Sequence, residues 1–458
     1  MARGGPGVAW RWREYVDRSA RQSPARLALG VFALVIAVVT AGLSAPWATA
    51  SGRPAPFVDA LFTAASASTV TGLVVVPTGE YWSAWGLVVI LVAIQIGGLG
   101  VMTLASLLGM AVSRRIGLTQ RLLVSSETKE TRLGEVGSLI RTVIITSVAL
   151  ELIIAVVLFP RFLMFDESVG SAAWHSAFYA ISAFNNAGFV PTPYGLEPFV
   201  SDWWVLMPII IGVFIGSLGF PVILNVARHL REPRRWSLHS KLTVTTSLAL
   251  VVAGSVLVAA FEWTNPDTFK PLGPSATALA SLFAGVMPRS GGFSTVDVGE
   301  MHEGTWLLMD ALMFVGGGSA STAGGIKVTT LAVMLLAILA EGRGDKDVEA
   351  YGRRIPREAL QVAIAVSLVS ATLVLVSSLL LLAMTGLTLD KVLFEVISAF
   401  ATCGLSTGIT ADLPDGAKYV LTVLMFIGRT GTMTLAAALA LRNRRRVIRL
   451  PEERPIIG

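Results

Sequence analysis

Four short loops in this sequence share one pattern, in which small or polar residues lead to a glycine. The loops are Thr69-Val70-Thr71-Gly72, Asn185-Asn186-Ala187-Gly188, Arg289-Ser290-Gly291-Gly292 and Thr402-Cys403-Gly404. Glycine adopts positive φ without a Cβ clash, and a ring of inward carbonyls can replace the water shell of a bare cation. Glycine also serves close helix packing, but four glycines at matching places favour a cation site. We therefore predict that the backbone carbonyls of these four loops bind a cation.

A second unusual stretch is rich in glycine and small residues and lies inside the apolar region 306–340. It reads Gly316-Gly317-Gly318-Ser319-Ala320-Ser321-Thr322-Ala323-Gly324-Gly325 and is followed by Ile326 and Lys327. Glycine costs about 1 kcal/mol per helical position relative to alanine, so a continuous helix is not expected. Irregular backbone at membrane depth must line water or protein, although close packing through small residues is an alternative. A phosphate-binding P-loop is excluded, because that loop ends Gly-Lys-Ser/Thr and here Lys327 lies between Ile326 and Val328.

One arginine, Arg429, falls within the apolar stretch 419–441. A charge at the centre of a membrane helix costs at least about 2.5–3.5 kcal/mol, so such a residue is by default functional. The alternative is a side chain that extends to the cytoplasmic surface, but Arg429 is far from the basic cluster that begins at Arg442. Lys327 lies near enough to an end of its stretch to extend in this way. Glu151 could be a buried partner or an interface residue.

The composition sets the class of protein that must position these residues. The chain has 458 residues, of which 53% are hydrophobic and 14% charged, and its mean hydropathy is +0.69. Soluble domains carry about 25% charged residues, so a soluble enzyme is excluded. The single cysteine, Cys403, excludes a disulfide framework and any multi-cysteine metal site. No catalytic constellation is visible, and no bound cofactor is expected beyond the cations themselves.

The apolar stretches predict an all-α polytopic membrane protein with about eight spanning helices. A spanning helix needs about 20 apolar residues, and the candidates are 27–52, 82–113, 142–160, 203–227, 242–261, 306–340, 359–389 and 419–441. Shorter apolar stretches, too short to cross, precede the four glycine loops at 58–67, 173–184, 276–286 and 391–402. We interpret them as half-helices, whose C-terminal ends carry about half a negative charge and would favour a cation.

The pattern repeats four times as span, half-helix, loop and span. The predicted repeats are 27–113, 137–231, 241–340 with the segment 316–325, and 359–441, between a cytoplasmic N-terminal segment 1–26 and a cytoplasmic tail 442–458. Most of the 36 Lys and Arg residues fall in the two end segments and in the loops after the second, fourth and sixth spans. By the positive-inside rule both termini are cytoplasmic. The net charge of +6 is thereby explained, and no nucleic-acid partner is expected.

These loops and spans resemble the Trk/Ktr/HKT superfamily of potassium transporters, and the KtrB-type subunit in particular. The resemblance rests on Thr-Val-Thr-Gly-Leu, Asn-Asn-Ala-Gly-Phe, Ser-Gly-Gly-Phe-Ser-Thr and Ala-Thr-Cys-Gly-Leu-Ser-Thr-Gly, and on the ending Pro451 to Gly458. It implies a K+ filter at the four loops, one pore per chain and a multi-pass protein of the cell membrane. It also implies a homodimer and a partner, a cytosolic ring of nucleotide-binding KtrA-type regulatory subunits.

The resemblance further implies that 316–325 is an intramembrane gating loop with Arg429 beside it, and we count Lys327 with this gate. Two departures are small: Cys403 stands where the family often has valine, and Gly291 where it often has alanine. Family members that favour Na+ carry serine at the position of Gly72. A Na+-coupled or Na+-permeable transporter of the same family remains an alternative. An ion-coupled solute carrier would predict inverted repeats, whereas these repeats are parallel, and a membrane-embedded enzyme would need clustered His, Asp or Cys.

Overall fold

The computed structural model describes residues 24–100, 103, 134–165 and 168–441. Three predicted parts therefore lie wholly or largely outside the described residues. They are the N-terminal segment, the end of the first repeat up to residue 113, and the tail 442–458 to which Pro451 to Gly458 belong.

Helices account for almost all regular structure in the described chain, which confirms the predicted all-α class. In chain order the elements are α2 Pro24–Leu43, η1 Pro46–Ala48, α3 Phe57–Ser68, α4 Thr78–Tyr81, the helix Ala84–Gly100, α6 Gly134–Phe162, α7 Val169–Phe184, η2 Glu197–Phe199, α8 Trp203–Leu218, α9 Phe220–Arg228, η3 Pro233–Arg235, α10 Leu238–Glu262, α11 Pro274–Val286, η4 Val298–Glu300, α12 Glu303–Phe314, α13 Val328–Arg343, β1 Val348–Ala350, β2 Arg353–Ile355, α14 Arg357–Met384, α15 Leu389–Phe400 and α16 Asp415–Leu441.

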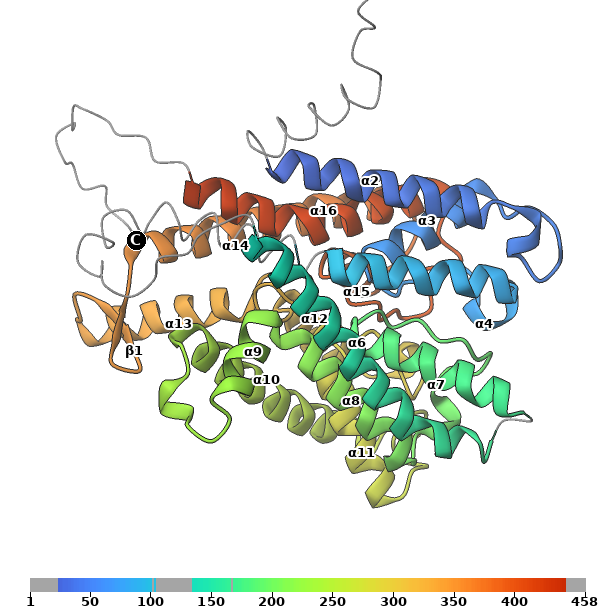
Figure 1. Cartoon of the computed structure of the whole chain (residues 1–458), viewed down its shortest axis with the longest axis horizontal. Coiled ribbons are helices and arrows are strands. Elements are labelled where there is room, and N and C mark those ends of the chain that lie inside the picture. The colour runs from blue at the N-terminus through green and yellow to red at the C-terminus, as the bar shows by residue number, and fades with distance from the viewer. Residues whose placement is uncertain (1–23, 101–102, 104–133, 166–167, 442–458) are drawn as a thin grey trace, which may run out of the picture.

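The helices form four similar units, each with a first helix, a short helix, a loop and a second helix. The short helices α3, α7, α11 and α15 fall on the four predicted half-helices. The first and fourth units lie side by side, through contacts of α16 with α2 and α3, and form the upper part of Figure 1. The second and third units meet through α8, α10 and α11 and form the lower part.

Three described helices, α6, α10 and α14, are each long and apolar enough to cross a membrane. The pair α8 and α9 passes the same test together but bends by 102° at Gly219. The prediction of one continuous span over 203–227 is therefore wrong in this detail. Gly219 has a φ of 92°, and a Cβ there would lie 2.5 Å from the carbonyl oxygen of Ser319. The bend makes room for the glycine-rich segment, and Pro221 in the first turn of α9 was the sequence signal for it.

The predicted span 306–340 is also broken, as its glycines indicated. Helix α12 ends at Phe314 and α13 begins at Val328. The strand-like bridge between Val315 and Ile326 joins the two ends of the intervening segment. The chain therefore enters and leaves this segment at nearly the same point.

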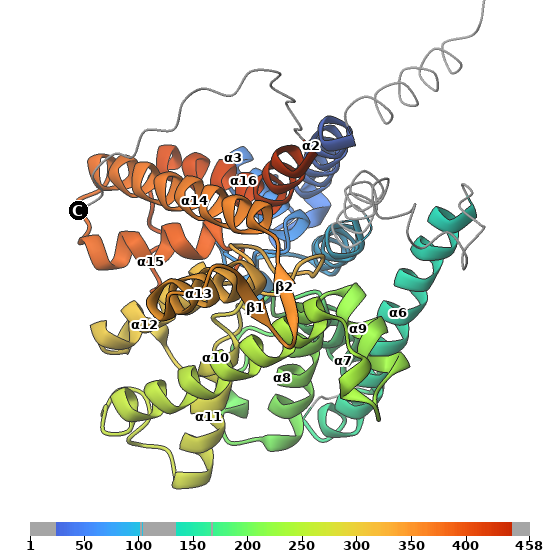
Figure 2. The same ribbon diagram turned by 90° about the vertical axis from the view of Figure 1, so that its left-hand side faces the viewer.

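A small antiparallel hairpin between α13 and α14 is an addition that the sequence analysis did not predict. Strand β1 pairs with β2 in the register Val348 to Ile355, and its turn residues Tyr351 and Gly352 have φ values of 52° and 71°. Positive φ at both central residues is the type I′ hairpin geometry. Val348 and Ile355 pack against Leu242, so the hairpin rests on the ends of α10, α13 and α14 (Figure 2).

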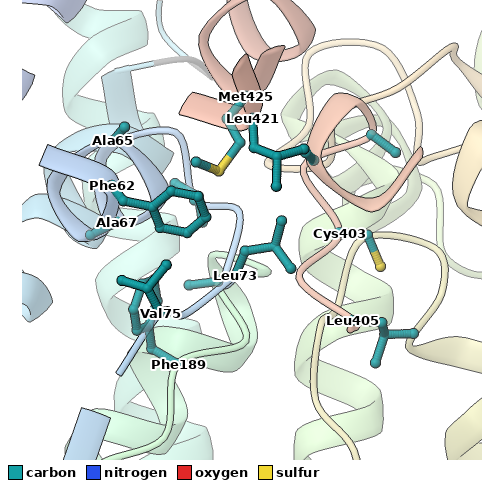
Figure 3. Packing of buried hydrophobic residues seen from close by; sticks show 14 of the residues in the cluster. Phe62, Ala65, Ala67, Leu73, Val75, Phe189, Cys403, Leu405, Leu421 and Met425 are labelled. Atoms are coloured by element: carbon teal, nitrogen blue, oxygen red, sulfur yellow. The ribbon is translucent and has the colours of Figure 1, made fainter. Parts of the chain in front are cut away.

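The buried core surrounds the glycine loops. Phe62 of α3, Leu73 just after the first loop, Phe189 just after the second, and Leu421 and Met425 of α16 belong to one cluster (Figure 3). All five side chains are at most 1% exposed. Because packed interiors yield little, this cluster fixes the loops against the surrounding helices.

Candidate functional site

The four glycine loops meet in a closed ring. A Cβ placed on Gly72 would lie 2.3 Å from the carbonyl oxygen of Ala187, and one on Gly188 would lie 2.9 Å from the Cα of Gly292. One on Gly292 would lie 2.3 Å from the oxygen of Cys403. The ring closes because a Cβ on Gly404 would lie 2.2 Å from the oxygen of Thr71. Each loop therefore touches the next in chain order, and the fourth touches the first.

The backbone conformation is the same in all four loops. The glycines have φ values of 91°, 69°, 73° and 98° in chain order. Two residues before each glycine stands a non-glycine residue that also has positive φ: Val70, Asn186, Ser290 or Thr402. Non-glycine residues rarely adopt this conformation. Four equivalent occurrences therefore mark a geometry that each unit holds against local strain.

Backbone hydrogen bonds show which way the peptide groups of the loops face. The N–H one residue before each glycine donates back to the short helix of its own unit, at 2.7–2.9 Å; the donors are Thr71, Ala187, Gly291 and Cys403. The N–H groups of Val70, Asn186 and Thr402 do the same. In a trans peptide the N–H and C=O point in opposite directions. The carbonyls of the preceding residues therefore face away from the short helices.

Three serines that the sequence analysis missed support this orientation. Ser66, Ser182 and Ser398 each stand six residues before the loop glycine of their unit. The Oγ of Ser66 accepts from the N–H of Gly72 at 3.0 Å, and that of Ser398 accepts from Gly404 at 3.1 Å. Ser182 Oγ instead donates to the carbonyl of Phe189 at 2.8 Å. The regular spacing was visible in the sequence, once the units had been aligned on their glycines.

Several predicted filter residues use their side chains to bind other protein groups. Arg289 donates from Nη1 and Nη2 to the carbonyl and Oγ of Ser247 on α10, at 3.0 and 2.9 Å. Cys403 Sγ lies 3.3 Å from the carbonyl oxygen of Pro288, and Thr69 and Thr71 pair through their hydroxyls at 2.7 Å. The side chain of Arg289 is thus directed toward α10, which leaves its backbone as the part of this residue that could line the ring.

The glycine-rich segment 316–325, here called the gating segment after the role that the family resemblance implies for it, packs into the bend between α8 and α9. The N–H of Gly318 donates to the carbonyl of Ser217 at 2.7 Å, and the N–H of Phe220 donates to that of Ala320 at 3.2 Å. A Cβ on Gly317 or Gly318 would lie within 2.5 Å of the carbonyl oxygens of Ser217 or Leu218. The glycines thus permit an approach between backbones that other residues would prevent.

The gating segment also touches the ring directly. The N–H of Gly324 donates to Ser290 Oγ at 3.3 Å, and the same hydroxyl donates to the carbonyl of Thr402 at 2.9 Å. A Cβ on Gly324 would lie 2.2 Å from Thr402 Oγ1 and 2.5 Å from the carbonyl oxygen of Ala401. With its amide nitrogen oriented to donate, Asn186 reaches Thr322 Oγ1 at 3.2 Å. Three of the four loops therefore contact this segment.

Two basic residues donate hydrogen bonds to carbonyls of the gating segment. Arg429 Nη1 donates to the carbonyl of Thr322, and Lys327 Nζ donates to that of Ala323 at 2.6 Å. Gly428 lets α16 pack closely against the C-terminal end of α15, because a Cβ there would lie 1.9 Å from the carbonyl oxygen of Phe400. Both positive charges therefore lie against the same short stretch of backbone.

Comparisons with known proteins identify the family of the chain. The TrkH family model, described as a cation transport protein, matches residues 15–445. The Ktr system potassium uptake protein B of Bacillus subtilis is 39% identical over 435 residues, which cover 95% of this chain and 96% of that protein. The protein of the same name from Vibrio alginolyticus is 36% identical, covering 87% and 88%. The potassium/sodium uptake protein NtpJ of Enterococcus hirae is 32% identical, covering 96% and 98%.

A solved structure shares the fold. The crystal structure of the potassium transporter TrkH from Vibrio parahaemolyticus aligns with a TM-score of 0.71 at 17% identity, over 90% of this chain and 84% of that one. The matching family model and the relatives described above are those of membrane transporters, so the protein is a multi-pass membrane transporter and not an enzyme. With the family model and these relatives covering almost the whole chain, it belongs to the Trk/Ktr superfamily of cation transport proteins as a KtrB-type member.

Proposed function

We propose that this chain is the pore-forming subunit of a potassium uptake system and conducts K+ through the ring of four loops. The observation that carries the proposal is the closure of that ring by four loops of equal backbone conformation, with carbonyls that face away from the short helices. Such carbonyls can replace the hydration shell of K+. The names of the B. subtilis and V. alginolyticus relatives, potassium uptake proteins, support K+ as the cation.

The gate of this pore is the gating segment, closed by its contacts with Ser290, Thr402 and Arg429. The charge of Arg429 also opposes the passage of a cation beneath the ring. Opening then requires that the segment leave these contacts. The gate is thus held by hydrogen bonds between backbone atoms of the segment and the side chains of Ser290 and Arg429, which another subunit can make or break.

The regulatory partner is a cytosolic ring of nucleotide-binding subunits, and the chain acts as a homodimer with both termini in the cytoplasm. The relatives are named as parts of a Ktr system, which supports a partner subunit. The hairpin β1–β2 with Arg353 and Arg354 lies in a loop that the positive-inside rule places in the cytoplasm, where such a ring would dock.

The test is a flux measurement on the purified chain in liposomes with defined K+ and Na+ gradients. We expect the reversal potential to follow the K+ gradient. We also expect the flux to change when the cytosolic regulatory subunits are added together with nucleotide. A second candidate is a pore that also passes Na+, which the potassium/sodium uptake protein at 32% identity favours. A reversal potential set equally by both cations would support that candidate, and absence of cation flux would overturn both.

A further inference from the structure

A buried carboxylate lies directly behind the second loop of the ring. Glu151, on the first helix of its unit, is only 6% exposed. Gln95 Nε2 donates to both of its carboxylate oxygens at 3.1 Å, and Asn185 Nδ2 donates to Oε1 at 3.0 Å. Burying a carboxylate inside a membrane protein costs free energy. We therefore expect Glu151 to have a function that an apolar side chain could not perform.

The amide nitrogen of Asn185 is held by several acceptors, whereas its Oδ1 is buried without a hydrogen-bond partner among the described residues. Its Nδ2 also donates to Gln95 Oε1 at 3.1 Å and to the carbonyl of Ile181 at 2.9 Å. Its Oδ1 packs against Gly98, where a Cβ would lie 1.9 Å away. Asn185 is completely buried. The amide is therefore clamped between α6, the helix Ala84–Gly100 and the end of α7.

Asn185 is the first residue of the second loop, so this clamp acts on the ring itself. The peptide group between Asn185 and Asn186 has its N–H bonded to the carbonyl of Ala183 at 3.1 Å, which directs the Asn185 carbonyl away from α7. The equivalent residue of the third loop, Arg289, is likewise tied to the first helix of its own unit through Ser247. Two of the four loops are thus held from behind by polar contacts.

We propose that Glu151 and Gln95 are positioning residues that set the K+ preference of the pore, because they hold Asn185 and with it one quarter of the carbonyl ring. The inference rests on the proposed function. Loss of either partner frees the Asn185 amide, and the second loop then settles in more than one position. K+ needs several well-placed oxygens in place of water, so a looser loop disfavours K+ relative to Na+.

The experiment measures the K+/Na+ permeability ratio from reversal potentials in liposomes. The variants are Glu151→Gln, Gln95→Glu, their combination, and Glu151→Asp, which keeps the charge but shortens the reach. The matched control is Asp202→Asn, the same acid-to-amide change at another polar contact of α6, where Asp202 accepts from Arg161 Nε at 2.6 Å. Arg161 lies about 15 Å farther along the helix than Glu151.

Each single variant at residues 95 and 151 removes or lengthens at least one hydrogen bond that Gln95 donates to Glu151, and thereby loosens the pair that holds Asn185. We expect each to lower the ratio by about tenfold, the size of one lost buried hydrogen bond. The combined variant restores one carboxylate and one amide within reach of Asn185 Nδ2, so it should recover most of the ratio. Asp202→Asn should leave the ratio unchanged, although it lowers thermal stability.

An unchanged ratio in the folded single variants would overturn the inference. So would a combined variant no better than the single ones, or an equal loss in Asp202→Asn, since each would show a general structural effect. Should Glu151→Gln fail to fold, Glu151→Asp and the combined variant decide by the same criteria. A parent chain without K+ preference would instead overturn the proposed function, and the two failures are thereby distinguished.

Discussion

Arg429 on α16 donates a hydrogen bond to the carbonyl oxygen of Thr322, in the middle of the gating segment. The arginine is 2% exposed. Its Nε and Nη2 atoms have no hydrogen-bond partner within the part of the chain that the structure describes. Loss of its acceptor would leave a buried guanidinium without compensation for its desolvation, so the hydrogen bond to Thr322 is energetically important. This contact therefore ties α16 to the gating segment.

The first prediction is that Arg429→Ala raises K+ flux through the chain in the absence of the regulatory ring. A hydrogen bond to a charged group contributes about 1.5–3 kcal/mol, so the open fraction should rise by about tenfold or more. Flux into liposomes loaded with a K+ indicator measures this. Arg429→Lys separates the causes, since it keeps the charge and loses the planar fork. Unchanged flux in well-folded Arg429→Ala would contradict the assignment of this contact to the gate.

The second prediction concerns the contact between the gating segment and the fourth loop. Gly324→Ala places a Cβ 2.2 Å from Thr402 Oγ1 and 2.5 Å from the carbonyl oxygen of Ala401, so the segment must move away from the ring. Flux without the regulatory ring should therefore rise, as it should when residues 316–325 are deleted. Gly342→Ala is the control, because no atom lies within 4 Å of its new Cβ. If Gly324→Ala conducts like the control, the segment does not close the path at this point.

The third prediction isolates the hydroxyl of Ser290, which joins the gating segment to the ring. Ser290→Ala removes the oxygen that accepts from Gly324 and donates to Thr402, while it keeps a Cβ at the same φ of 84°. We expect higher flux and a lower K+ preference together, because one group holds both gate and loop. Ser290→Gly should show the same rise in flux and the same fall in K+ preference. It should also be more thermally stable than Ser290→Ala, since glycine relieves the positive φ. A change in flux alone would mean that the hydroxyl serves the gate and not the ring.

The sequence predicted the short helices and the loop glycines because both follow from local physics. Half-helix lengths are set by apolar runs, and Gly72, Gly188, Gly292 and Gly404 are needed for positive φ at a close approach. The break of the gating segment followed from glycine's low helix propensity. Each of these features can be deduced from a short window of residues.

Other features depend on contacts between distant parts of the chain. Pro221 signals a new helix after Gly219, but the close approach of Ser319 to Gly219 cannot be read from an apolar run. The role of Glu151 remained open because its partners, Gln95 and Asn185, stand in other helices. Arg289 was assigned to the filter from its position, yet its side chain bonds to Ser247 on α10. Side-chain direction at a loop is decided by which helix packs behind it.

The last prediction tests the ring itself through its glycines. Gly72→Ser and alanine at Gly188, Gly292 or Gly404 should each lower the K+/Na+ preference, by at least about tenfold if one carbonyl set is displaced. Each new Cβ meets backbone of the neighbouring loop at 2.2–2.9 Å, and backbone cannot turn aside as a side chain can. A side chain at positive φ adds about 1–2 kcal/mol of strain.

The effect of backbone strain at positive φ must be separated from the effect of displacing the ring. A substitution at Gly408 allows this comparison. It has a φ of 90°, similar to the ring glycines, but nothing lies within 4 Å of a Cβ there. Gly408→Ala therefore carries the strain without the collision and should keep the parent's preference. The measurement is growth of a K+-uptake-deficient strain at limiting K+, with and without added Na+, at matched expression. If the four ring variants grow like Gly408→Ala and Na+ inhibits none of them more strongly, these glycines serve packing and the carbonyl ring does not select the ion.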